Sequence, residues 1–358
     1  MTEGPRSPAP AAPAGEPPQR PAWMPPPAAR LGAWHWTRND LPWLGRSLGG
    51  GPLRSLAAPP GGLDGVLGWG LKPLAHAARV VATLRRLPYW TAEDGLLRSV
   101  GLGKSGVPSI SVVVDDIGIH IDARRPSRLE RLCLEAPDPA LRQRAGALRR
   151  SLVAQRLTKY NHLPDRPLGL GPAPGRRILL VDQVFGDRSI AGACADAAAF
   201  AAMCAAADAA PGAVICARVH PDVAAGYVEG YLAPLLGRRP DVVLIDGEVA
   251  THAVLDAVDE VWTVSSQMGF DALLRGMPVR CFGVPFYAGW GLTDDRADTA
   301  LARAALARRA PRRLDLDDLV AAALIAYPLY ACPDTGRPIT PEAAVERLVA
   351  ERAAYFAR

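Results

Sequence analysis

Residues 260–296 read EVWTVSSQMGFDALLRGMPVRCFGVPFYAGWGLTDDR. Residues 260–266 predict a short buried strand, 269–276 a helix and 278–283 a second strand, so that strand, helix and strand follow one another. The run 278–296 then mixes aromatic side chains and glycines with a Thr-Asp-Asp-Arg end. Glycines let a backbone approach a ligand and aromatic rings build walls, so we interpret this run as a loop that shapes a pocket, with walls formed by Phe282, Phe286, Tyr287 and Trp290.

The same alternation extends toward the N-terminus. Further strands are predicted at 176–183 (RRILLVDQ), 213–221 (AVICARVHP) and 241–247 (DVVLIDG), with a helix over 191–209. Short apolar strands separated by helices favour a parallel sheet with helices on both faces. We therefore expect an α/β fold in this half of the chain.

A second αβ unit is predicted before residue 163. It contains a strand at 65–70, a helix at 71–86, a β-hairpin at 109–123 and mostly helix over 126–160, where Ser127 is spaced from Glu130 as in a capping box. Four prolines and three glycines in LPDRPLGLGPAPGRR (163–177) predict a linker between the two units. The interpretation is a two-domain α/β enzyme with an interdomain cleft.

The expected organisation has four parts. The Pro/Ala-rich start is predicted to be a disordered tail, because prolines remove backbone donors and fix φ. An N-terminal α/β domain, a C-terminal α/β domain and a helical segment follow. The boundaries are 1–30, 31–165, 166–330 and 331–358.

Composition excludes several classes of protein. The net charge of +5, from 41 basic and 36 acidic residues, is a mild excess and does not indicate nucleic-acid binding. A basic surface could favour anionic sugars, nucleotide phosphates or an anionic membrane face, but for most of the arginines a solvated surface is the favoured interpretation. The sequence contains no uninterrupted stretch of about 18 apolar residues, so no membrane span is predicted. The six cysteines lie far apart with no CxxC pair, which predicts reduced core residues and a cytoplasmic protein, with any membrane contact peripheral.

Asp187 lies in VDQVFGDRS (181–189), just beyond a predicted buried strand. The carboxyl ends of strands in open α/β sheets face the ligand crevice, so this carboxylate is a candidate nucleophile or base. The alternative is that Asp187 caps the following helix, and spacing alone favours the cap. Gln183 of the same motif is a candidate substrate-binding residue.

His220 and Pro221 end the next predicted strand. The proline stops the strand and leaves the histidine at its tip, where it could donate a hydrogen bond to a phosphate. A structural histidine is the alternative. Farther along, Ser265 and Ser266 close a strand before Gly269 opens a helix, which predicts an anion seat; the same serines could act only as helix caps.

The first domain supplies acidic candidates. AEDGLLRSVGLG (92–103) places Glu93 and Arg98 near glycines after a strand end, either as a general acid/base site or as a charged turn. Asp115 and Asp116 precede a glycine at the predicted hairpin, and we interpret them as turn residues. No cluster of metal ligands is evident, and the pair Asp294–Asp295 beside Arg296 is expected to be a salt-bridged loop.

With these motifs in order, the chain resembles the capsule polysaccharide biosynthesis proteins of the KpsC/LipB type, the retaining β-Kdo transferases. The resemblance covers about residues 63–350. It rests on EDGLLRSVGLG, PSISVVVDDIGIHIDARRPSRLE, VDQVFGDRSI, ARVHPDVAAGYVEGYL, VSSQMGFDALLRGMPV, CFGVPFYAGWGLTDDR and LYACPDTGRPIT.

The resemblance implies a GT-B-like fold of two Rossmann-type domains, with the donor CMP-β-Kdo between them and no cofactor. It implies Asp187 as the catalytic carboxylate, Glu93 as its acid/base partner, and His220, Ser265 and Ser266 around the CMP phosphate. Arg98 could pair with the Kdo carboxylate. The expected acceptor is a lipid of the phosphatidylglycerol type or Kdo itself, at the inner face of the cytoplasmic membrane.

The sequence departs from the family in two respects. Family members that build a linker carry two modules in tandem, whereas this chain has one, so a partner transferase or capsule export proteins could complete its work. The Pro-rich start matches nothing in the family.

Three alternative functions stay open: a transferase for another CMP-activated sugar acid, a non-catalytic export accessory, and an enzyme for a different nucleotide. The lack of GxGxxG or P-loop spacing disfavours the last of these.

Overall fold

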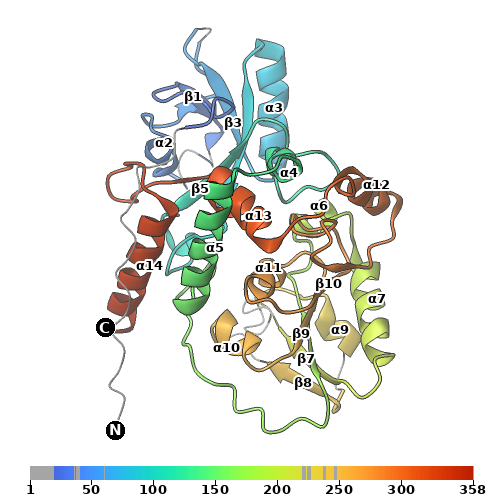
Figure 1. The fold of residues 1–358 in the computed structure, drawn as a ribbon. Coiled ribbons are helices and arrows are strands. Elements are labelled where there is room, and N and C mark those ends of the chain that lie inside the picture. The colour runs from blue at the N-terminus through green and yellow to red at the C-terminus, as the bar shows by residue number, and fades with distance from the viewer. Residues whose placement is uncertain are drawn as a thin grey trace.

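The computed structural model describes residues 20–357 except 36, 38–40, 60, 220–222, 224–226, 237–238 and 246–247. Two domains lie one above the other, joined by a long connection that runs around the lower domain (Figure 1). Each domain is built on a six-stranded sheet. None of the helices in the described part of the chain is long and apolar enough to cross a bilayer.

The sheet of the second domain is parallel throughout, as predicted. Its strand order is β11-β10-β9-β6-β7-β8, so the order reverses between β6 and β9. The strands are β6 (Arg177–Val181), β7 (Val214–Arg218), β8 (Val242–Ile245), β9 (Glu260–Thr263), β10 (Val279–Cys281) and β11 (Asp294–Asp295).

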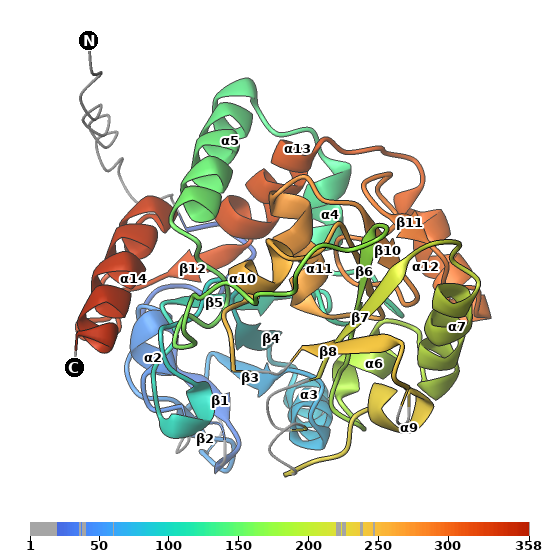
Figure 2. The ribbon, with the colours of Figure 1, turned by 90° about the horizontal axis from the view of Figure 1, so that it is seen from below.

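Alternate side chains of β6 face opposite layers of helices, as a strand requires. Ile178 and Leu180 pack with α7 and α9, and Leu179 and Val181 lie in the cluster that contains α10 and α11 (Figure 2). Helices thus cover both faces. They are α6 (Arg188–Gly192), α7 (Ala197–Asp208), α9 (Leu232–Leu236), α10 (Thr251–Leu255), α11 (Gln267–Leu274) and α12 (Ala300–Arg309).

The helix predicted over 191–209 is two helices. Cys194 has a φ of 59°, which breaks the first, and the Asp196 side chain caps the second by accepting from the N–H of Ala198.

The first domain has a mixed sheet in the order β12-β5-β4-β3-β1-β2, in which β5 is antiparallel to both of its neighbours. The strands are β1 (Leu31–Ala33), β2 (Arg54–Ser55), β3 (Gly65–Trp69), β4 (Tyr89–Asp94), β5 (Ser111–Asp115) and β12 (Pro328–Tyr330). The helices packed with it are α2 (Leu44–Ser47), α3 (Pro73–Arg85), α4 (Arg128–Leu134), α5 (Pro139–Ala154), α13 (Leu316–Val320) and α14 (Pro341–Phe356). A 3₁₀ turn at Gly103–Ser105 and a π-helix at Ala321–Ala326 complete the regular structure.

The predicted hairpin at 109–123 is wrong. Only β5 forms there, and Asp115 then turns the chain, because its Oδ1 accepts from the N–H groups of Ile117 and Gly118. The turn chemistry expected of Asp115 is thus confirmed. His120 is buried against Phe286 of the second domain and Tyr327, so this segment joins the domains instead of returning along the sheet.

Two expected boundaries also differ from the structure. The tail was expected to reach residue 30, yet Met24 is buried and Trp90 Nε1 donates to the carbonyl of Trp23 at 2.9 Å, so residues 20–30 pack on the first domain. The second domain was expected to reach residue 330, yet β12 pairs with β5 and α14 lies beside α5 (Figures 1 and 2). The chain therefore returns to the first domain before its C-terminal helix.

Candidate functional site

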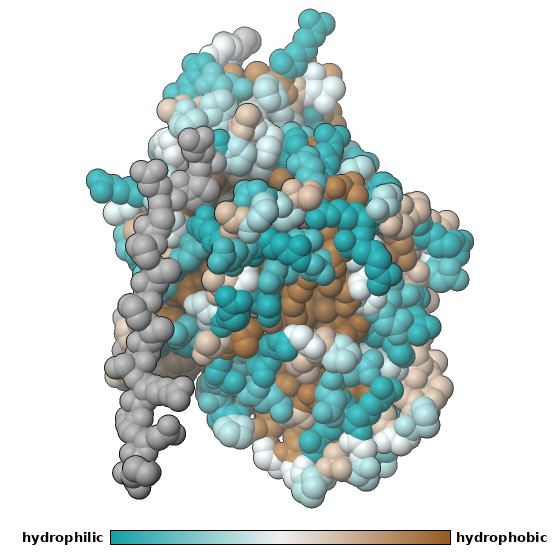
Figure 3. Space-filling model, in the orientation of Figure 1, coloured by the Kyte–Doolittle hydropathy of each residue, from teal (hydrophilic) through white to brown (hydrophobic). Residues whose placement is uncertain are grey.

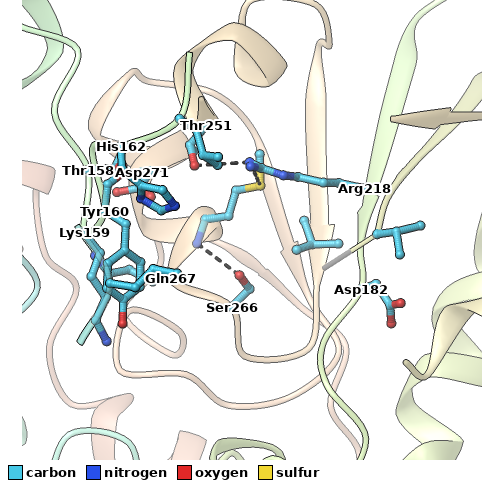
Figure 4. Close-up of a pocket in the computed structure, with 15 residues that line it drawn as sticks. Thr158, Lys159, Tyr160, His162, Asp182, Arg218, Thr251, Ser266, Gln267 and Asp271 are labelled. Carbon is cyan, nitrogen blue, oxygen red and sulfur yellow. Dashed lines mark hydrogen bonds between the residues drawn. The ribbon is translucent and has the colours of Figure 1, made fainter. Parts of the chain in front are cut away.

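A cavity of about 250 Å³ lies between the domains at the reversal of strand order. In doubly wound sheets this position, at the carboxyl ends of the strands, is where ligands bind. The second domain contributes the ends of β6 and β7 and the start of α11, and the first domain contributes residues just before the linker (Figure 4). Its lining includes Leu102, Thr158, Lys159, Tyr160, His162, Asp182, Arg218, Val219, Thr251, Ser266, Gln267, Met268 and Asp271.

The first turn of α11 is held firmly against this cavity. Ser266 is its N-cap, and its Oγ accepts from the N–H of Met268 at 3.2 Å. The N–H of Ser266 donates to Thr263 Oγ1, and Tyr287 donates its hydroxyl proton to the Ser266 carbonyl at 2.5 Å. The predicted anion seat and the predicted cap thus use the same serine, which also lines the cavity.

Gln183 and Ser265 form two hydrogen bonds that join the segments after β6 and β9 beside the cavity. Gln183 Nε2 donates to Ser265 Oγ, and the Ser265 N–H donates back to Gln183 Oε1, both at 2.9 Å. The hydroxyl of Ser189 lies 3.4 Å from that of Ser265. The loop after β6 and the turn before α11, which are far apart in sequence, therefore meet here.

Asp187 is exposed and caps α6. Its Oδ1 accepts from the N–H of Ser189 at 2.8 Å, as the capping interpretation predicts. Ser189, two residues after Asp187, contacts Ser265 in the turn before α11. His220 and Pro221 lie outside the described residues, but Arg218 and Val219, which precede them, both line the cavity.

Arg218 is a buried cation in the cavity wall. It is 8% exposed, and its guanidinium donates to Thr251 Oγ1 at 3.1 Å (Figure 4). The guanidinium also donates to the Val249 carbonyl at 2.9 Å. Desolvation lowers its pKa to about 10, and the carboxylate of Asp271 opposes that shift. A cation kept out of water in a cavity wall attracts an anionic ligand strongly.

Asp271 and Lys159 complete the charged lining. Burial raises the pKa of Asp271 to about 7, although Arg218 and Lys159 both lower it. Desolvation lowers the pKa of Lys159, but Tyr160 and the carboxylates of Asp94 and Glu93 outweigh that effect and leave the pKa above its ordinary value. Cations from both domains thus face one cavity.

Glu93 lies at the end of β4, half-buried. Burial, and secondly the charge of Asp94, raise its pKa to about 7, while Lys159 and Lys72 lower it. A carboxyl group with a pKa near neutrality is suited to general acid or base chemistry. Lys159 connects Glu93 electrostatically with the cavity that this lysine lines.

Arg98 differs from expectation. It is 2% exposed and each guanidinium nitrogen has an internal partner: Asp94 Oδ2 at 2.8 Å, Ser99 Oγ at 2.7 Å and the Val107 carbonyl at 3.0 Å. Arg98 therefore organises the loop after β4 and does not point into the cavity. Arg218, in contrast, lines the cavity.

The aromatic run also differs. Phe282, Phe286, Tyr287 and Trp290 are all buried, and none of them lines the cavity. The rings of Phe286 and Tyr287 pack on Phe270 of α11 and on each other, whereas Phe282 packs on Trp262 in the other core cluster. Gly289 and Gly291 have φ of 83° and 80°, so these glycines serve tight turns instead of close approach to a ligand.

Gly269 has a packing role. A Cβ placed on it would lie 2.3 Å from the Tyr287 hydroxyl oxygen, so only glycine lets Tyr287 reach Ser266. The loop that follows is salt-bridged as expected, since Asp294 pairs with Arg280 and Arg296, each at 2.7 Å. Within the part of the chain that the structure describes, no group of three or more His, Cys, Asp and Glu residues could hold a metal ion.

Several lining residues escaped the sequence analysis. Lys159, Tyr160 and His162 belong to KYNHLP, a polar cluster immediately before the linker that we did not consider. Asp271 is the lone carboxylate of the mostly apolar segment 269–276, which was a usable signal. Arg218 lies two residues before His220 in the same motif, and the sequence analysis considered only the histidine and proline.

The sequence matches known proteins over most of its length. The family described as capsule polysaccharide biosynthesis protein matches residues 64–166 and 169–330. The capsule polysaccharide modification protein LipA of Neisseria meningitidis serogroup A is 44% identical over 77% of this chain and 40% of LipA. The lipopolysaccharide-processing protein LpsZ of Rhizobium meliloti is 38% identical over 79% of this chain and 63% of LpsZ. The chain thus spans about two fifths of LipA.

Two solved structures resemble the fold over 90% of the chain. The β-Kdo 2,4 transferase of Thermosulfurimonas dismutans KpsC has a TM-score of 0.81 at 38% identity and is covered over 98% of its chain. The β-Kdo 2,7 transferase of the same KpsC has a TM-score of 0.66 at 26% identity and is covered over 99%. The predicted fold class, α/β and GT-B-like with two Rossmann-type domains, is confirmed.

Proposed function

Because the chain belongs to the capsule polysaccharide biosynthesis protein family, we propose that it is a glycosyltransferase that moves β-Kdo from CMP-β-Kdo to an acceptor in capsule assembly. One observation carries the proposal: the cation-lined cavity lies between the two domains at the reversal of strand order. Such a cavity suits a donor that carries both a phosphate and a sugar carboxylate.

Arg218, Lys159 and the first turn of α11 would hold the anionic groups of the donor. Arg218 presents a planar guanidinium suited to paired contacts with phosphate or carboxylate oxygens, whereas Lys159 presents a point charge from the opposite domain. The Ser266 hydroxyl adds a donor at the positive end of α11. His220 and Pro221 follow Arg218 in the chain, and we assign them to the same phosphate site.

The reaction would be a double displacement with retention. The Asp187 carboxylate attacks the anomeric carbon, forming an ester to Kdo, while the bond to the CMP oxygen breaks and CMP leaves with that electron pair. Glu93 then takes the proton of an acceptor hydroxyl, whose oxygen attacks the same carbon and releases Asp187. Two inversions preserve the β configuration, and the proton ends on Glu93.

The acceptor would be a Kdo residue or a lipid of the phosphatidylglycerol type, reached by peripheral contact with the membrane. Of the two KpsC structures, the 2,4 transferase is the more similar, which favours transfer to the 4-hydroxyl group of an acceptor Kdo. A second transferase module would supply any other linkage.

The test of catalysis is transfer from CMP-Kdo, generated in situ, to a synthetic Kdo acceptor. We expect Asp187→Asn and Glu93→Gln each to lose about 10²- to 10⁴-fold in rate. Asp196→Asn is the matched control, since Asp196 caps α7 just as Asp187 caps α6, through Oδ1 and the N–H two residues on. Asparagine caps a helix as well as aspartate does. If Asp187→Asn keeps wild-type transfer, Asp187 is only a cap.

Donor binding is tested separately, by calorimetry with CMP. Arg218→Met removes the buried guanidinium and should weaken CMP binding about tenfold or more. Arg176→Met, at an exposed arginine just before β6, should leave it unchanged. CMP binding without any turnover would indicate a non-catalytic accessory protein, and turnover with a different CMP-activated acid would replace Kdo as the donor.

A further inference from the structure

A second, smaller cavity of about 150 Å³ lies in the first domain and is unusually basic. It is formed by the residues after β3, the start of α3 and the turn that follows β5. Its basic lining residues are Lys72, His76, Arg79, Arg124 and Arg125. Asp122 is the one acidic residue in that lining, and it is paired with Arg124 at 2.6 Å.

The positive charges of this cavity are only partly used by the protein itself. Arg79 lies over the ring of Tyr89, 4.5 Å from its centroid, and its Nη2 is 3.5 Å from Thr91 Oγ1. Arg125 is exposed and has no hydrogen bond, ion pair or ring contact with any residue that the structure describes. The lining therefore has an excess of cations that an anionic ligand would satisfy.

This basic cavity lies next to the proposed catalytic groups. A Cβ placed on Gly70, which lines it, would be 2.5 Å from Glu93 Oε2. Lys72 at its rim and Lys159 of the donor cavity both act on the Glu93 carboxyl. The Glu93 carboxylate thus adjoins the backbone of Gly70 in the basic cavity and interacts electrostatically with Lys159 of the donor cavity. Leu71 also lines the basic cavity, and it meets Gly192 at the end of α6, the helix that Asp187 caps.

We propose that the basic cavity binds an anionic group of the acceptor, either the carboxylate of a sugar acid or the phosphate of a lipid headgroup. The inference rests on the proposed function and names the acceptor subsite of that reaction. An acceptor held there by its anion places a neighbouring hydroxyl beside Glu93. Holding the acceptor hydroxyl in this position lowers the entropic cost of reaching the transition state and so raises the rate of transfer.

The test uses the full chain saturated with CMP, so that the donor cavity is occupied. Three probes are titrated by calorimetry: methyl β-Kdo glycoside, its uncharged methyl ester, and glycerophosphoglycerol. We expect the charged glycoside to bind and its ester to bind about tenfold more weakly or worse. Binding by glycerophosphoglycerol instead would identify a lipid phosphate as the anion.

Arg125→Ala and Arg79→Gln should each weaken binding of the charged probe about tenfold and raise the acceptor KM without changing the donor KM. Arg85→Ala is the matched control, because Arg85 is the last residue of α3, at the opposite end from the cavity. Equal binding of ester and glycoside, or equal loss in Arg85→Ala, would overturn the proposal. Failure of CMP itself to bind would instead refute the proposed function, so the two failures are distinguishable.

Discussion

Burial in the cavity wall controls the charge state of Asp271. Burial raises its pKa to about 7, so the folded state favours the protonated acid. The unfolded chain releases that proton near the ordinary aspartate pKa of about 4. The stability contributed by the protonated form is therefore complete below about pH 4 and is lost as pH rises through about 7.

We predict that Asp271→Asn removes this pH dependence. Between pH 5 and pH 8 the wild type should lose a few kcal/mol of unfolding free energy relative to the variant, at about 1.4 kcal/mol per pH unit until the folded pKa is passed. Urea denaturation at both pH values measures the difference. Asp298→Asn, at an exposed aspartate, controls for general charge effects. A parallel fall in wild type and Asp271→Asn would contradict the assignment.

Among the elements, α11 shows how aromatic packing prepares a binding turn. Tyr287 reaches the Ser266 carbonyl only because position 269 lacks a side chain. Gly269→Ala should therefore displace the tyrosine and destabilise the fold by about 1–3 kcal/mol. It should also weaken CMP binding, because the first turn of α11 lines the cavity.

A double-mutant cycle separates this contact from a general preference for glycine. Tyr287→Phe alone loses one buried hydrogen bond, at a cost of about 1 kcal/mol. In that background Gly269→Ala should cost less than in the wild type, because the hydroxyl oxygen it meets is gone. Strict additivity of the two unfolding free energies would show that Tyr287 is not the obstacle.

At the scale of the whole molecule, one buried ion-pair cluster joins the two domains. Glu130 of α4, which is 4% exposed, accepts from Arg308 at 2.9 Å and from Arg309 at 3.2 Å, both on α12. Arg309 also donates to the carbonyls of Pro285 and Ala288, in the aromatic loop beneath α11. Hydrophobic side chains appear at the surface where the two domains meet (Figure 3).

Glu130→Ala leaves Arg309 buried without its carboxylate, so it should destabilise the protein by about 3–5 kcal/mol. Glu135→Ala, at the exposed end of the same helix, should cost under about 0.5 kcal/mol. Chemical denaturation followed by tryptophan fluorescence checks both. If the two variants unfold at the same denaturant concentration, the cluster does not hold the domains together.

Local sequence patterns were enough to predict elements whose partners lie nearby. The parallel strands of the second domain, the Ser127 cap and the turn at Asp115 are confirmed, because hydrophobic period and capping chemistry act over a few residues. The prediction of a second hairpin strand was wrong because His120 is buried against Phe286, a contact between residues far apart in the chain.

The sequence by itself determined the two αβ units, the linker between them and the motifs that meet at the strand ends. Only the tertiary structure decided which side chains face the cavity: it buried Arg98 and the aromatic loop, brought Lys159 and Arg218 together from different domains, and returned β12 to the first sheet. The physical reason is that a charged or aromatic side chain is stabilised by whatever surrounds it after folding. Those surroundings come from segments that no local pattern relates.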